Sequence, residues 1–289
     1  MTGLSCHNFD VLYDFIGGDA MCSRLKYNYG DPLKKIRTVK DRLNFKDRLL
    51  LTLFRLRTGT SIENTAFFFG VSKTVAGKVF DTFIQLLYLQ FLRLKEEMFT
   101  PKTAQPQAVR PTCLKPFDNY RVTIDSTSVK IEMPYHYRQQ GNTFSSYKSA
   151  NVGTVMVGCN CHGAVSFVSQ VFEGALSDID LFEKSNIVDM LHPNDVIIGD
   201  RGFTVQPLLD PVEVKILIPA FLGDRERLSA EEELLNKRIS AARVHVERTI
   251  RKIKCFHLLK KVTNKMLPLL SQCFYVAACL TNFDGPNVR

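Results

Sequence analysis

Three acidic residues occupy positions where an acidic side chain needs a specific explanation. Asp125 lies inside the apolar stretch RVTIDSTSVKIE, where a carboxylate is costly unless water or a cation compensates it. Asp200 follows the apolar run VIIG, at the point where a buried strand would open into a loop. Glu247 is the single acid among seven Lys and Arg residues between Arg243 and Lys261. Carboxylates that lie close together stay ionised most easily around a divalent cation, so the three predict a metal site beside a phosphate-binding face.

Two of these acids also have an ordinary structural explanation. An isolated GDRG stretch is typical of a strand-end turn, in which Asp200 caps its own loop. On a helix, Glu247 can bridge Arg243 and Arg251 at i±4, which contributes about 0.2–0.5 kcal/mol per pair. This bridge explains the presence of Glu247 but not the excess of positive charge around it. A metal-ligating carboxylate on a phosphate-binding face explains both.

The elements that must position these acids alternate between strand and helix. Three strands, a helix, two further strands and a closing helix follow in that order, over residues 121–132, 151–160, 164–174, 177–191, 196–200, 214–220 and 229–254. Ser229 and Glu232 predict a capping box at the start of the closing helix. This order predicts an α/β fold with a ribonuclease-H-like mixed sheet and flanking helices. In that fold the first strand is central and adjacent to the fourth, so Asp125 and Asp200 would face each other.

The closing helix has one apolar face and an adjacent charged stripe. Its spacing predicts that the buried face consists of Leu235, Ile239, Ala242, Val246, Ile250 and Ile253. Arg243, Glu247, Arg251 and Lys254 follow one another at helical spacing along the adjacent stripe.

An all-α region precedes the predicted sheet. A helix that ends at Gly59, a short helix capped by Ser61 and a longer helix capped by Ser72 follow one another over residues 45–100. This order is that of a helix-turn-helix, whose second helix would offer its first residues to a DNA groove, namely Lys73, Thr74 and Lys78. The same periodicity also fits any three-helix bundle.

Composition and the positions of the prolines set the remaining domain boundaries. Four prolines between Pro101 and Pro116 indicate an extended connector. We therefore expect a lead-in over residues 1–44, a DNA-binding region over 45–100, a connector over 101–119 and a nuclease domain over 120–289. The net charge of +9 favours a polyanionic partner. The apolar stretch 266–283 is broken by polar residues and predicts a buried helix, and no membrane segment is expected.

The eight cysteines are scattered, which suits reduced thiols in the nucleus or the cytoplasm. The closest group, Cys159-x-Cys161-His162, lies between two strand-like runs beside Gly163. No second ligand pair is spaced for zinc, so this group predicts a hairpin turn instead of a metal site.

The chain resembles the DDE superfamily endonucleases of the Harbinger transposase type. The stretches that carry the resemblance extend from about Phe45 to Phe283 and include TIDST, FSSYKSANV, VSFVSQVFEGALSD, IIGDRGF, LSAEEE, ARVHVERTI and VAACLTNF. The resemblance implies that Asp125, Asp200 and Glu247 are the catalytic acids and metal ligands. Asp178 stands where the family has a further acid at a helix start, and both a metal ligand and a helix cap remain open for it.

The resemblance implies divalent-metal-dependent cleavage of DNA, and possible strand transfer by a freed 3′-OH at the same site. Asp125 would bridge two Mg²⁺ or Mn²⁺ ions about 3.5–4 Å apart, and Asp200 and Glu247 would each hold one of them. Arg201, Arg248, Arg251 and Lys252 would neutralise phosphates, and Lys148 with Tyr147 would contact the substrate backbone unless they are plain surface residues.

The expected partner is double-stranded DNA, and nuclear localisation follows from it. A separate DNA-binding protein and a homo-oligomer are kept open as further partners. A rival class is a transposase-derived protein that holds DNA or a partner without cutting it. An RNA-cleaving relative on the same fold is a third class, against which the helix-turn-helix favours duplex DNA.

Overall fold

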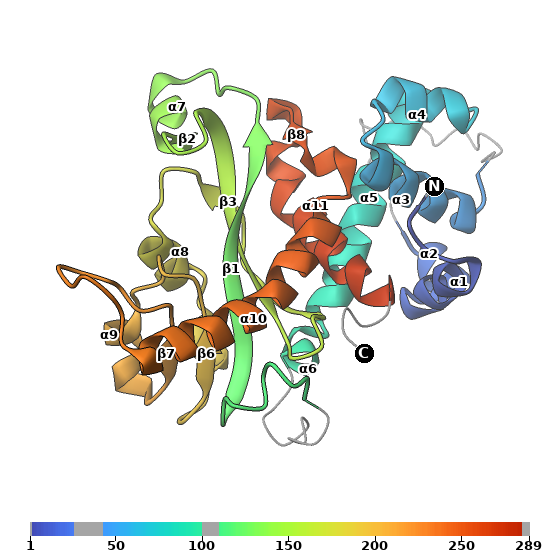
Figure 1. Ribbon diagram of the computed structural model, residues 1–289. Coiled ribbons are helices and arrows are strands. Elements are labelled where there is room, and N and C mark those ends of the chain that lie inside the picture. Colours follow the sequence, from blue (N-terminus) through green and yellow to red (C-terminus); the bar gives the residue numbers. More distant parts are fainter. Residues whose placement is uncertain (1, 26–42, 100–109, 285–289) are drawn as a thin grey trace.

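A mixed β-sheet forms the centre of the molecule (Figure 1). The computed structural model describes residues 2–25, 43–99 and 110–284, and within these the main path of the sheet has the order β2-β3-β1-β6-β7. β1 (Tyr120–Ile131) pairs antiparallel with β3 (Ala150–Cys159) and parallel with β6 (Val196–Ile198). The predicted ribonuclease-H-like sheet, with its first strand in the middle, is therefore confirmed.

The remaining strands are short and lie around this centre. They are β2 (Phe144–Ser145), β4 (Val165–Val168), β5 (Phe172–Glu173), β7 (Lys215–Leu217) and β8 (Lys261–Val262). The single strand expected over residues 164–174 is split into β4 and β5. The interruption falls at Ser169, whose Oγ accepts a hydrogen bond from the backbone N–H of Met156 at 2.9 Å. The turn between β3 and β4 contains Gly163 at a φ of 76°, as expected for a hairpin turn.

Helix α10 (Ala230–Ile253) crosses the sheet diagonally (Figure 1). Its predicted capping box is present, because the Oγ of Ser229 accepts from the Glu232 N–H at 3.1 Å and Glu232 Oε2 accepts from the Ser229 N–H at 2.8 Å. The predicted buried face is confirmed from Ile239 to Ile253, with His245 and Thr249 also buried. The prediction was wrong for Leu235, which is exposed because the burial of α10 begins only at Ile239.

The helix predicted from Ser177 is shorter than expected. α8 (Asp178–Lys184) ends where Asn186 adopts a left-handed conformation with a φ of 55°, and a 3₁₀ turn, Ile187–Met190, follows. A left-handed residue interrupts the helical hydrogen bonds, so the helix ends here. The apolar periodicity of the sequence continues past this point, and the prediction that relied on it was therefore too long.

The helix-turn-helix order is present at the expected positions. α3 (Phe45–Thr58), α4 (Ile62–Phe68) and α5 (Lys73–Leu92) begin at caps formed by Asn44, Ser61 and Ser72. Left-handed Gly59 ends α3, and Gly70 lies in the turn between α4 and α5.

The helical region and the sheet share one hydrophobic core. α11 (Leu267–Leu280) lies between the sheet and α5, and the rings of Tyr88 and Tyr275 meet edge to face at 5.3 Å (Figure 1). Side chains from α3, α5, α11, β1 and β3 belong to a single buried cluster. α1 (Cys6–Phe15) and α2 (Gly18–Cys22) pack on the outer side of this layer. The lead-in is thus helical where it is described, and residues 26–42 lie outside the described residues.

In the part of the chain that the structure describes, one stretch, Asn264–Phe283, is long and apolar enough to cross a membrane by length and composition alone. More than half of it is buried inside the fold, and α11, which it contains, packs against α5. It is therefore a core helix, as the sequence predicted.

Part of the predicted connector also packs into the fold. Residues 100–109 lie outside the described residues, but Leu114 and Phe117 are buried. The buried guanidinium of Arg110 donates to the carbonyl oxygen of Phe117 at 3.1 Å. Leu114 and Phe117 belong to one buried cluster with Tyr120, so the described end of the connector packs against the amino end of β1.

Gly59→Ala is expected to lower the free energy of unfolding by about 2–4 kcal/mol. Its φ of 69° costs an alanine about 1–2 kcal/mol, and an added Cβ would lie 2.8 Å from the backbone carbon of His257. Gly70→Ala is the matched control, because Gly70 has a φ of 63° and no atom within 4 Å of an added Cβ. Urea denaturation should show a smaller loss for Gly70→Ala, and equal losses would contradict the packing of α3 against residue 257.

Candidate active site

Asp125 and Asp200 are neighbours because of the register between β1 and β6. Thr123 lies beside Ile198 in this parallel pair. Asp125 follows Thr123 by two positions, and Asp200 follows Ile198 by two positions. Neighbouring strands run about 4.8 Å apart, so the two acids lie side by side where β6 ends. The Gly199 N–H still donates to the Leu217 carbonyl at 3.1 Å, which holds this strand end in the sheet. Two acids separated by 74 intervening residues of sequence are thus brought together at the carboxyl end of β6.

Arg243 joins two of the predicted acids from the helix above the sheet. One of its guanidinium nitrogens lies 3.1 Å from Asp200 Oδ1, and the other lies 3.5 Å from Glu247 Oε1. The Arg243 side chain is 16% exposed, whereas those of Asp200 and Glu247 are about half exposed. The i,i+4 pair considered as an ordinary explanation of Glu247 is therefore present, but its arginine also contacts the strand-end aspartate. The turn explanation of Asp200 holds as well, because its Oδ1 accepts from the Arg201 N–H at 2.7 Å.

Asp125 is half-buried among these charged groups. Burial raises the pKa of Asp125 from 3.8 to about 6, and repulsion from Asp200 and Glu247 adds to the effect. The Arg243 guanidinium and the Ser126 N–H, which donates to Asp125 Oδ1 at 2.9 Å, act in the opposite direction on this pKa. Asp125, Asp200 and Glu247 therefore lie within electrostatic reach of one another, with Arg243 among them.

Asp178 lies beside the loop that carries Asp200. A Cβ added to Gly202 would collide with Asp178 Oδ2, so the absence of a side chain at residue 202 makes room for this carboxylate. The helix-cap explanation for Asp178 is wrong, because Ser177 is the N-cap of α8 and forms a capping box with Asp180. Asp178 is the first residue inside the helix, where a negative charge is favourable. Its role as a metal ligand stays a prediction.

Two lysines extend the charged surface beside Asp125. Burial lowers the pKa of Lys254, repulsion from Lys148 lowers it further, and attraction by Asp125 raises it. Lys148 Nζ also lies 4.5 Å from the centre of the Tyr147 ring. The sequence had assigned Lys148 to the substrate backbone, but it gave no role at the site to Arg243 or Lys254. The signal for both was their spacing, since Arg243, Glu247 and Lys254 are four and seven residues apart on one helical face.

The basic residues predicted near the acids are on the expected elements. Arg248 and Arg251 are exposed on α10, and Lys252 is half-buried. Arg201 follows Asp200 directly, and its guanidinium donates to the Ala220 carbonyl at 3.2 Å and lies over the Phe221 ring. Their contacts with phosphate stay predictions.

The predicted DNA-contacting residues of the helix-turn-helix lie at the start of α5. Lys73 is exposed and forms an ion pair with Glu63 of α4, so part of its charge is already compensated. Thr74 is exposed and Lys78 is half-buried. Farther along, α5 is buried against α3 and α11, which leaves its first turns as the part that a groove could reach.

The donor groups at this site fit a hard divalent cation. Asp125, Asp200 and Glu247 supply carboxylate oxygens, the ligands that Mg²⁺ takes in proteins. Burial, and after it repulsion from the other two acids, raises the pKa of Asp125, and Arg243 offsets this effect only in part. Within residues 2–25, 43–99 and 110–284, no three His, Cys, Asp or Glu side chains are close enough together to hold a metal ion. Since Arg243 contacts two of the carboxylates, a cation shared by all three requires its guanidinium to move away.

The stability of the metal-free protein should depend on pH through Asp125. Its pKa is about 6 in the folded protein and 3.8 when exposed, so the folded state binds more protons between these values. Stability should therefore fall as pH rises through this window, by up to about 3 kcal/mol in total. Asp125→Asn should remove this fall.

Urea denaturation in a chelator between pH 4 and pH 7 measures this effect. Asp180→Asn is the control, because hydrogen bonds from Ser177 lower the pKa of Asp180 and its contribution changes with pH in the opposite direction. Parallel pH profiles for the wild type and Asp125→Asn would show that Asp125 is well solvated.

Comparisons with known proteins find two matches to family models in the chain. Residues 124–282, more than half of the chain, match the family described as DDE superfamily endonuclease. Residues 41–92 match the helix-turn-helix of DDE superfamily endonuclease. No curated protein matches the chain.

Proposed function

Because the chain belongs to the DDE superfamily endonucleases and carries their helix-turn-helix, we propose that it cleaves phosphodiester bonds of duplex DNA with divalent metal ions. The observation that carries this proposal is that Arg243 pairs with both Asp200 and Glu247, while Asp125 is within electrostatic reach of all three residues. The likeness to Harbinger transposases, drawn from the sequence, suggests the transposase branch of the family.

Asp125, Asp200 and Glu247 would hold the metal ions, and Asp178 would contribute from the start of α8. When bound, such ions supply Lewis-acid activation of water and stabilisation of the leaving oxygen. Half-exposed Asp200 and Glu247 face solvent, where a phosphate can approach. Half-buried Asp125 anchors the group at the sheet, because its backbone lies in the antiparallel pairing of β1 with β3, opposite Val157.

Cationic side chains around the acids would hold the DNA backbone. Arg248, Arg251 and Lys252 follow Glu247 on α10, and Lys148 and Lys254 lie within electrostatic reach of each other. Arg243 has a separate role in this proposal. It compensates the carboxylates in the metal-free protein and would turn toward a phosphate when a metal replaces it.

Arg243→Gln is expected to tighten Mg²⁺ binding by about tenfold. In the wild type a cation must displace a guanidinium from Asp200 and Glu247, whereas glutamine leaves both carboxylates without a counter-charge. Without metal, this variant should unfold at a lower temperature than the wild type, because uncompensated carboxylates repel. Calorimetric titration and thermal melts with and without Mg²⁺ measure both effects.

Arg238→Gln provides the control, since Arg238 is an exposed residue of the same helix. Equal Mg²⁺ affinities for the wild type, Arg243→Gln and Arg238→Gln would contradict competition between the guanidinium and the metal.

The test of the proposed function is cleavage of a supercoiled plasmid. The wild type should nick it with Mg²⁺ or Mn²⁺ and not with chelator, and Asp200→Asn should be inactive while retaining DNA binding. Plasmid that stays intact under every metal condition, with wild-type protein that binds DNA, would contradict the nuclease.

Intact plasmid together with DNA binding by the wild type would favour a transposase-derived protein that binds DNA without cutting it. The ion pairs of Arg243 support this alternative, because they compensate Asp200 and Glu247 without a metal. Under it, Arg243→Gln would destabilise the protein, and Mg²⁺ would not restore the loss.

A further inference from the structure

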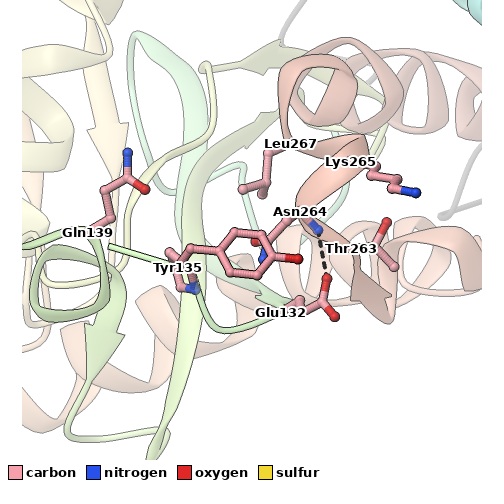
Figure 2. Close-up of a pocket in the computed structure, with 8 residues that line it drawn as sticks. Glu132, Tyr135, Gln139, Thr263, Asn264, Lys265 and Leu267 are labelled. Carbon is pink, nitrogen blue, oxygen red and sulfur yellow. Dashed lines mark hydrogen bonds between the residues drawn. The ribbon is translucent and has the colours of Figure 1, made fainter. Parts of the chain in front are cut away.

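A cavity opens at the carboxyl end of β1, away from the carboxylates. It has a volume of about 620 Å³, within the range of sites that bind small molecules. Its walls come from residues 132–139, which follow β1, and from residues 263–267, which lead into α11 (Figure 2). The two segments are held together at Glu132, whose Oε2 accepts from the Asn264 N–H at 3.0 Å.

Asn264 lines this cavity and carries a hydrogen-bond acceptor without a donor in the described part of the chain. Its Nδ2 donates to the Met133 carbonyl at 3.1 Å, which fixes the orientation of the amide. Its Oδ1 is buried and accepts no hydrogen bond from any side chain or backbone group in the described part of the chain. A buried acceptor without a donor is costly, so the site fits a ligand that brings an N–H group.

Tyr135 supplies a flat aromatic surface at the same place. Its ring extends across the cavity toward Asn264 and Thr263 (Figure 2). The residue is nevertheless 85% exposed, so most of the ring has no protein partner. An exposed ring beside hydrogen-bonding groups is the arrangement on which proteins stack unpaired nucleobases.

The charge around the cavity suits a nucleic-acid strand. Residues 133–149 contain Arg138 and Lys148 and no acidic residue, and residues 257–266 contain Lys260, Lys261 and Lys265 and no acidic residue. Lys265 lines the cavity itself, on the side opposite Gln139 (Figure 2). Glu132 is the one acid in its lining, and its Oε2 is already bonded to the Asn264 backbone.

We propose that this cavity captures an unstacked nucleobase of the bound DNA strand. The base stacks on Tyr135 and donates an N–H to Asn264 Oδ1, while Lys265 contacts the neighbouring phosphate. Bases with an exocyclic amine, which are adenine, guanine and cytosine, suit this acceptor better than thymine. The inference rests on the proposed function for its DNA, but it requires no cleavage.

The site is well separated from the carboxylates. Glu132 follows Asp125 by seven residues along β1, which corresponds to about 23 Å of extended strand. A strand that reaches both sites therefore has several nucleotides between the cleaved bond and the captured base. The cavity would set where the strand separates from its complement, independently of the chemistry.

The test uses 2-aminopurine, a fluorescent base with an exocyclic amine, in a duplex with a short single-stranded 3′ extension. The label occupies one position at a time, and binding is measured in a chelator so that no cleavage is needed. The wild type should quench one position strongly through stacking. Tyr135→Ala should abolish this quenching and weaken binding of the extended duplex by about 5- to 100-fold, whereas Tyr135→Phe should keep both.

Tyr137→Ala is the matched control, because Tyr137 is 89% exposed in the same segment but does not line the cavity. Equal effects of Tyr135→Ala and Tyr137→Ala, or no effect of either, would overturn the proposal. A second arm uses free dGMP and dTMP as competitors. Competition by dGMP and not by dTMP supports base capture. Binding of dGMP that depends on Tyr135, with no such dependence for the oligonucleotide, would assign the cavity to a free nucleotide and overturn strand capture.

The outcomes separate this inference from the proposed function. Wild-type protein that shows Tyr135-dependent quenching but never nicks DNA would support base capture and contradict the nuclease. Wild-type protein that nicks DNA, with no effect of Tyr135→Ala on quenching or binding, would support the nuclease and contradict base capture.

Discussion

Glu247→Gln is expected to lower Mg²⁺-dependent nicking by more than about 100-fold while duplex affinity stays at or above that of the wild type. Loss of an outer-shell partner of a metal ligand already costs about 10- to 100-fold, and Glu247 is proposed as a ligand itself. Glutamine keeps the shape of the side chain and a hydrogen-bond acceptor for Arg243, so the fold should survive. Binding should not weaken, because the change removes one negative charge from a basic surface.

The measurement combines a nicking rate, duplex affinity and a thermal midpoint for one variant. Glu231→Gln is the control, since Glu231 lies exposed in the first turn of the same helix, far from Arg243. Nicking by Glu247→Gln at the wild-type rate would leave Glu247 as a surface ion-pair partner of Arg243 and would favour the binding protein.

The segment 110–289 is expected not to fold on its own. Its helix α11 packs against α5, and the buried cluster that contains both helices also includes side chains of α3, β1 and β3. Removing residues 1–109 would expose one side of α11, whose sequence is mostly apolar. A truncated protein with a cooperative thermal transition, monodisperse in solution, would contradict this shared core.

Point variants test the same interface without truncation. Phe83 is fully buried on α5, and Phe83→Ala should cost about 3–5 kcal/mol. Leu89→Ala on the exposed side of the same helix should cost much less. The contrast follows from the orientation of α5, whose inner side meets α3 and α11.

This shared core makes the helix-turn-helix part of the same folding unit as the sheet. The sequence predicted a DNA-binding region over residues 45–100 and a separate nuclease domain after a connector, because four prolines lie between Pro101 and Pro116. A run of prolines indicates a connector from local sequence alone. The packing of α5 on α11 depends instead on side chains almost 200 residues apart, which no local pattern reveals. Substitutions at Thr74 or Lys73 are therefore better probes of DNA contact than deletions.

Much of the fold follows from local signals in the sequence. The caps at Ser61, Ser72 and Ser229 and the glycine ends at Gly59 and Gly70 each act within a few residues. The end of α8 at Lys184 was missed, because the left-handed conformation of Asn186 shortly after it is not dictated by the apolar periodicity of the sequence.

The candidate site was predictable in its acids but not in its arginine. An acid inside an apolar strand and an acid after a buried strand are unusual, and the expected strand order brought Asp125 and Asp200 together. Arg243 looked like an ordinary i,i+4 partner of Glu247, because its second contact, with Asp200, comes from another element. The cavity at Tyr135 likewise joins two segments more than 120 residues apart, which no local pattern reveals.

Iron-directed cleavage of the protein tests whether Asp125, Asp200 and Glu247 hold one divalent-metal site. Fe²⁺ bound in place of Mg²⁺ generates hydroxyl radicals with ascorbate and peroxide, and these cut the backbone near the metal. We expect cuts around residues 125, 200 and 247, with a further cut near 178 if Asp178 is a ligand. Excess Mg²⁺ and Asp125→Asn should both suppress them. Cuts confined to other parts of the chain, or cuts that persist unchanged in Asp125→Asn, would contradict a metal site at these three residues.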